Sequence, residues 1–101
     1  MSDDKYMYLF TRKDLSPQQQ IIQTAHAAHI IGKKQECDSV PNAVLIGINS
    51  EFDLIGIKDY LDYFEIAHEL FYEPDISQHT AIATYPLVGD EREPLKKFAL
   101  M

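Results

Sequence analysis

The chain has 101 residues, 46% of them hydrophobic and 25% charged, which is the composition of one globular domain. Its formal charge of −7 would repel the phosphates of a nucleic acid, so composition does not predict bulk nucleic-acid binding. No apolar run approaches the about 20 residues that a membrane-spanning helix needs. The single cysteine, Cys37, excludes an intrachain disulfide, and residues 1–5 do not resemble a signal peptide, so we expect a cytoplasmic protein.

The first predicted elements are a strand, a tight turn and the start of a helix. Tyr6–Phe10 is an apolar run rich in aromatic residues, and the charged residues 12–14 end it. Ser16 is a suitable N-cap, because its hydroxyl can accept from an unpaired backbone amide. Pro17 suits the first helical position, and Gln19 lies where a capping box would need it. These signals predict a helix over residues 18–28 and beyond.

This first helix is expected to have an apolar side and a polar side. The end is predicted at Gly32, since the lysines at 33 and 34 favour the C-terminal pole of a helix. Residues 33–42 are then expected to form a loop. Spacings of four and three place Gln19, Gln23 and His26 on one face of the helix. The apolar side is predicted from Ile21, Ile22, Ala25, Ala28 and either Ile30 or Ile31.

The second strand and second helix follow directly. Ala43–Ile48 is a continuous apolar run, typical of a strand buried on both faces in the centre of a sheet. Asn49 or Ser50 then caps a helix that starts near Glu51. Roughly helical spacing predicts that this helix buries Phe52, Ile55, Tyr60 and Tyr63.

The segment after Tyr63 has two interpretations. The apolar stripe could continue through Phe71 as one long helix, or Ile66–Tyr72 could form a strand. Pro74 ends either one, because it disfavours helical geometry in the preceding residue. Thr80–Tyr85 is predicted as a strand, residues 89–94 as a charged loop, and the apolar residues of 95–101 as a tail that docks on the core.

The resulting order is strand, helix, strand, helix, strand, strand and tail. Alternating strands and helices favour an α/β fold, a single domain with a mixed sheet of about four strands and helices packed on it. In such folds the ligand crevice lies beyond the carboxyl ends of the parallel strands. The turn over residues 12–19 is such a place, and its helix N-terminus could receive a carboxylate or phosphate.

Several segments resemble the second type of peptidyl-tRNA hydrolase. Leu9–Leu15 followed by Gln23–Ala28 is similar to that family's first strand and helix, in which an arginine and an aspartate precede a glutamine and a histidine. Val44–Leu54 and Thr80–Pro86 are similar to its second strand and its last strand. The resemblance covers most of residues 6–86 in the same order. It implies a hairpin of the last two strands and supports the strand interpretation of Ile66–Tyr72.

The active site implied by the resemblance departs from the family pattern. The family's catalytic turn lysine has no counterpart, because the turn here is Ser16–Gln19 and Lys13 lies before Asp14. An aspartate and a threonine of the family, four residues apart, correspond in spacing to Glu73 and Ser77. With His26, these two residues are the candidate catalytic residues. The candidate substrate-binding residues are Arg12, Lys13, Asp14, Ser16, Gln19 and Gln23.

Each candidate also has an ordinary structural explanation. His26 could be a general base, because an imidazole exchanges protons near neutral pH, or a packed helix residue. Arg12 could contact a ligand or simply pair with Asp14. Glu73 and Ser77 could form an acid/base pair or cap their own turn. The histidines lack the spacing of a zinc motif, so we expect no metal and no cofactor.

Two functions of different class follow. One is hydrolysis of the ester bond of peptidyl-tRNA, or of a related acyl ester, by water activation, with the tRNA 3′ end as partner. The other is a non-catalytic α/β binding module that keeps the fold and cleft and binds a small anion or a protein partner. In the second case we expect a homodimer formed through exposed aromatic side chains.

Overall fold

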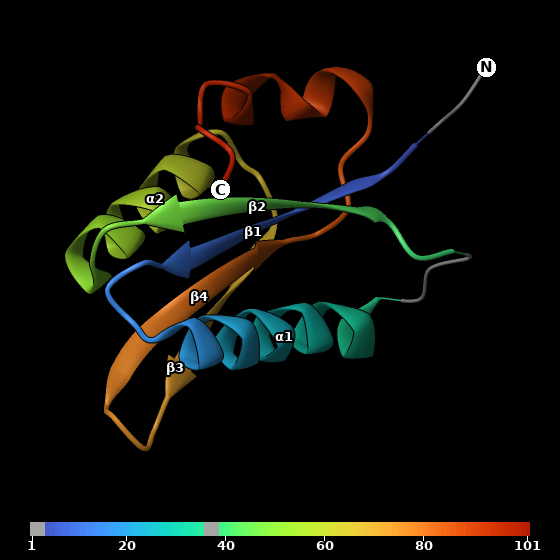
Figure 1. Cartoon of the computed structure of the whole chain (residues 1–101). Coiled ribbons are helices and arrows are strands. Elements are labelled where there is room, and N and C mark those ends of the chain that lie inside the picture. The colour runs from blue at the N-terminus through green and yellow to red at the C-terminus, as the bar shows by residue number, and fades with distance from the viewer. Residues whose placement is uncertain (1–3, 36–38) are drawn as a thin grey trace.

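Four strands form one mixed sheet in a computed structural model that describes residues 4–35 and 39–101 (Figure 1). Cys37 and parts of the segments 1–5 and 33–42 lie outside the described residues. The strand order is β2-β1-β4-β3, with β1 parallel to β2 and antiparallel to β4, and β3 antiparallel to β4. The strands are β1 (Tyr6–Arg12), β2 (Asn42–Ile48), β3 (His68–Glu73) and β4 (Gln78–Thr84). This arrangement is the predicted α/β fold.

Helices cover the two faces of the sheet. On one face α1 (Pro17–Lys34) packs against β1, β3 and β4, and on the other α2 (Glu51–Tyr63) packs against β1 and β4. The short 3₁₀ helix η1 (Gly89–Leu95) shares the core under α2. Because side chains alternate along β1, Phe10 lies in the core under α2 while Leu9 packs in the core under α1.

Both helices begin where their sequence signals predict. The Ser16 hydroxyl accepts a hydrogen bond from the Gln19 amide at 3.2 Å, and the Ser50 hydroxyl accepts one from the Asp53 amide at 3.2 Å. Each cap satisfies a backbone donor that the helix itself leaves unpaired. The Gln19 side chain serves a different purpose from the expected capping box, because its oxygen accepts from Gln23.

The segment after α2 forms a strand. The helix ends at Tyr63, and β3 and β4 make a hairpin joined by Pro74–Ser77. The single long helix is therefore wrong. Ser77 has φ 53°, and this left-handed conformation closes the turn.

The second strand is not buried on both faces. β2 occupies an edge of the sheet, and Ala43 and Leu45 on its α1 side are exposed. Its other side, with Ile46 and Ile48, belongs to the core under α2. The apolar run correctly predicted a strand but not its place, because hydrophobicity does not specify which neighbours will cover a residue.

The predicted buried faces of the two helices are wrong in part, although Ile31 in α1 is buried and Tyr60 in α2 packs against the core, as predicted. In α1, Ile21 is 71% exposed, whereas Gln23 is 1% exposed. In α2, Phe52 and Tyr63 are 86% and 80% exposed. The side chains that these helices bury are Gln23, Thr24, Ala27 and Ile31 in α1, and Leu54 and Leu61 in α2.

The C-terminal segment docks on the domain, as predicted. Residues 89–95 form η1 rather than a loop. Leu95 is 1% exposed, and the Phe98 ring meets the Phe10 ring edge to face at 5.6 Å. The Met101 amide donates to the Leu45 carbonyl at 3.0 Å, so the tail pairs with part of the outer edge of β2. Among the described residues, no helix is both long and apolar enough to cross a membrane.

Candidate functional site

Two hydrogen-bond networks lie where β1 ends and β3 turns into β4. The Gln23 network consists of Gln19, Gln23, Glu73 and Thr80. The Arg12 network consists of Arg12, Asp14, Gln78 and His79. Each network joins side chains from segments far apart in the sequence.

Gln23 is the centre of the first network. Its amide nitrogen donates to Glu73 Oε1 at 3.0 Å and to Gln19 Oε1 at 2.8 Å. Its amide oxygen accepts from the Thr80 hydroxyl at 3.0 Å. A buried amide is costly unless it is hydrogen-bonded, and these three bonds explain how a glutamine can be 1% exposed.

A β-bulge brings Thr80 into this network. Phe71 pairs with Ala81, but the next residue, Tyr72, pairs with His79, which leaves Thr80 as the extra residue. Bulges re-aim side chains relative to the regular ladder. Here the re-aimed hydroxyl contacts α1 and fixes the orientation of the Gln23 amide. Thr80 could not be found from the sequence, because nothing in a strand sequence marks a bulge.

The Glu73 carboxylate is held on two sides. Besides the bond from Gln23, its Oε2 accepts from the Asp75 amide at 3.3 Å. The Gln23 hydrogen bond, followed by that of Asp75, lowers the pKa of Glu73 below its ordinary value of 4.5, and the nearby His26 also contributes. His26 is itself exposed, and its ring packs on the Phe71 ring with the centroids 4.9 Å apart. Glu73 thus lies beside the first turns of α1.

The Arg12 guanidinium is occupied within the domain. Arg12 is 6% exposed, and its Nε and Nη2 donate to the two Asp14 oxygens at 2.9 and 2.6 Å. Its Nη1 donates to Gln78 Oε1 at 2.6 Å and to the His79 carbonyl at 3.0 Å. The pairing lowers the pKa of Asp14 and raises the pKa of Arg12. Four hydrogen bonds therefore make this cation a clamp between β1 and β4.

A second acidic group borders the Arg12 network. Glu51, in the first turn of α2, accepts from the His79 amide at 2.7 Å, and its Oε2 lies 3.5 Å from His79 Nδ1. Glu51 also contributes to the raised pKa of Arg12. Sequence reasoning did not select Glu51 for the site, although its place at a helix start after a parallel strand is where such residues gather.

The remaining predicted site residues lie outside the two networks. Lys13 is exposed, and its aliphatic stem covers Gly47, so that a Cβ on Gly47 would lie 2.7 Å from Lys13 Cδ. Ser16 serves as the cap of α1. Ser77 is exposed in the turn, and its side chain makes no hydrogen bond with the described part of the chain.

The arrangement offers an oriented carboxylate at the rim of the domain. Glu73 is partly exposed, so water can reach a carboxylate whose position is fixed by Gln23. A lowered pKa keeps the group charged but makes it a weaker general base. Within residues 4–35 and 39–101, no three histidine, cysteine, aspartate or glutamate side chains gather in a way that could hold a metal ion.

Comparisons with known proteins establish the fold alone. No family model matches the chain, and no curated protein matches it. Among solved structures, the chain is similar to a protein of unknown function, Atu0240, from Agrobacterium tumefaciens strain C58, with a TM-score of 0.71 and 14% sequence identity. The match covers 100% of this chain and 99% of that one. The two proteins therefore share one fold over almost their whole length.

The substitution Arg12→Ala is expected to lower the free energy of unfolding by about 2–4 kcal/mol, because it leaves Asp14, Gln78 and a carbonyl without their donor. Urea denaturation measures this loss. The exposed Lys33 is the control, and Lys33→Ala should stay within about 0.5 kcal/mol of the wild type. Equal stability of the two variants would contradict the clamp.

Glu73 should titrate below 4.5, and Gln23→Met, which removes the hydrogen bond at similar volume, should raise its pKa toward that value. Because the folded-state pKa is lowered, the bond stabilises the fold above the unfolded-state pKa, and this stabilisation is lost as the pH falls through the folded-state value. Carbon-13 NMR of the carboxyl group follows the titration. Gln18→Met, exposed on the same helix, should leave it unchanged; an unaltered pKa in the Gln23 variant would refute the assignment.

Proposed function

We propose that this protein is an acyl-ester hydrolase of the peptidyl-tRNA hydrolase kind, in which Glu73 holds the attacking water. The observation that carries the proposal is the hydrogen bond from Gln23 to Glu73. It joins the hairpin that carries Glu73, a candidate catalytic residue, to the polar start of α1, which carries the candidate binding residues Gln19 and Gln23.

The reaction would use groups at the surface of the domain. Glu73 accepts a proton from water as the water oxygen attacks the acyl carbon, and the tetrahedral intermediate then expels the ribose oxygen, which takes up a proton. The Gln19 amide nitrogen, whose partner oxygen is already bound by Gln23, is placed to donate to the ester carbonyl. His26, exposed one helical turn after Gln23, supplies the proton to the leaving oxygen.

Cation contacts to the tRNA end fall to Lys13 in this proposal, because the donors of Arg12 are engaged by Asp14, Gln78 and His79. A single lysine on a protein of charge −7 gives weak attraction to phosphates, and binding should fall as salt is added. Arg12 then acts as a positioning residue that holds the end of β1 against β4. Asp14 is also a positioning residue, because its carboxylate forms the ion pair that orients Arg12.

A turnover assay on an N-acetylated aminoacyl-tRNA tests the proposal. Glu73→Gln should reduce ester release by at least about 100-fold, as expected when a general base is lost. Asp75→Asn removes one charge from the same hairpin and should stay within about twofold of the wild type. Wild-type protein that releases nothing above the uncatalysed background would end the hydrolase proposal.

The second candidate function is the non-catalytic binding module, and the engagement of Arg12 favours it. A carboxylate with a lowered pKa and a guanidinium engaged by Asp14 are also the features of a network with a structural role. In this case the exposed aromatic side chains of α2, Phe52 and Tyr63, form the surface for a protein partner or a second copy. Light scattering over a range of concentrations tests the homodimer, and a monomer throughout would exclude it.

The cytoplasmic location stays a prediction from the single cysteine.

A further inference from the structure

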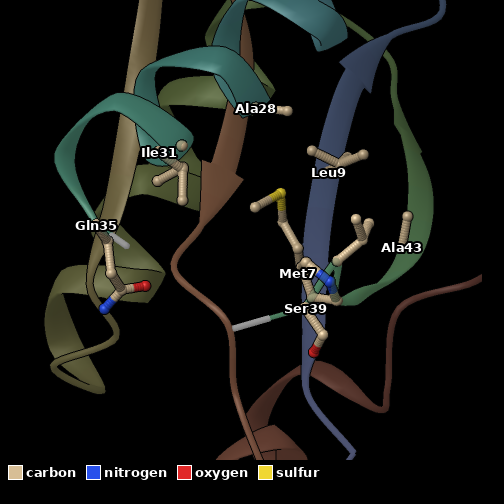
Figure 2. A pocket seen from close by; sticks show the side chains of 10 residues that line it. Met7, Leu9, Ala28, Ile31, Gln35, Ser39 and Ala43 are labelled. Carbon is tan, nitrogen blue, oxygen red and sulfur yellow. The ribbon is translucent and has the colours of Figure 1, made fainter. Parts of the chain in front are cut away.

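A groove of about 830 Å³ lies against the C-terminal half of α1, away from the Gln23 network. Its floor is the side of β1 that faces α1, and Figure 2 shows Met7 and Leu9 there, with Ala28 and Ile31 above them and Ala43 across from them. Gly32 completes the helical wall. None of these residues belongs to the Gln23 or Arg12 networks, so the groove is a separate feature of the domain.

The groove is open because α1 lies over the part of the sheet formed by β1, β4 and β3 and leaves β2 uncovered. The helix packs on β1, β3 and β4, and β2 lies at the edge beyond β1. Paired parallel strands are ordinarily covered on both faces. Here Ala43 and Leu45 of β2 stay exposed on the α1 side.

Small side chains keep the walls apart. Ala28 and Gly32 on α1 face a strand that offers Ala43. Apart from its own helix, no described atom lies within 4 Å of the position that a Cβ on Gly32 would take, so the packing of residues 4–35 and 39–101 does not require glycine there. Glycine within a helix makes the helix less stable than alanine does. The missing side chain of Gly32 leaves space in the groove.

We propose that this groove binds one small, neutral, apolar molecule. Its volume lies within the about 300–1,000 Å³ of typical small-molecule sites, which are mostly apolar with few polar groups. No charged side chain is among the described residues that line it, and a charged ligand would lose its hydration without a partner. The hydroxyl of Ser39 lies at the groove and provides one hydrogen-bonding group.

Fluorescence titration with the neutral dye N-phenyl-1-naphthylamine tests the proposal. The wild type should bind the dye saturably, one molecule per chain. Ala28→Phe and Ala43→Phe each place a large ring in the groove at positions outside the buried core, and each should weaken binding at least about tenfold. Ala67→Phe, an exposed position that does not line the groove, is the matched control and should bind like the wild type.

Two further measurements make the result decisive. Urea denaturation should show all three variants folded, and amide chemical shifts on adding dye should change for Met7 and Leu9. Absence of saturable binding, or equal binding by the filled variants, would overturn the proposal. A concentration-dependent dimer that Ala28→Phe abolishes would also overturn it, because a second copy would then be the occupant.

Discussion

The central constraint of this structure is that β1 is hydrogen-bonded along both of its edges. It is parallel to β2 on one side and antiparallel to β4 on the other. Its alternating side chains therefore pack into both hydrophobic cores, Phe10 into the core under α2 and Leu9 into the core under α1. The two candidate sites lie toward opposite ends of this strand: Arg12 belongs to the polar networks and Met7 to the apolar groove.

The helix α1 has two chemically different halves. Its first turns are polar and bury Gln23 against Thr80 and Glu73, whereas its last turns present small and apolar residues to the groove. The buried side of the helix is stabilised differently along its length. Near its start the buried side chains form hydrogen bonds, and further on Ala27 and Ile31 pack against apolar residues. Mutations in one half need not disturb the other.

The charged groups of the polar end are mostly engaged in hydrogen bonds within the domain. Arg12 is paired with Asp14, and Glu51 and Glu73 accept hydrogen bonds from an amide of β4 and from the Gln23 side chain. Such a satisfied network rigidifies the junction of strands and helices. It also limits catalysis, since a group already engaged has less to offer a substrate. The hydrolase proposal needs water at Glu73, and the partial exposure of its side chain provides that access.

The sequence by itself determined the first two strands, the two helices and the last strand, and it left the segment after Tyr63 open between helix and strand. Ser16 and Ser50 mark helix starts through local hydrogen bonds, and Pro74 ends a segment through its own ring. Spacing and resemblance also indicate Glu73 and Gln23 as candidate site residues, and this assignment stays a prediction. Such signals act within a few residues, so they can be read without knowing the fold.

Only the tertiary structure decided which faces and edges are covered. Ile21 is exposed while Gln23 is buried, because the sheet beneath α1 supplies Thr80 and Glu73 as partners for the amide. The apolar run of β2 ended at an edge with one open face, and the bulge at Thr80 depends on the register of β3. Apolar character predicts that a residue will be buried but not against what, since burial is a property of the assembled neighbours.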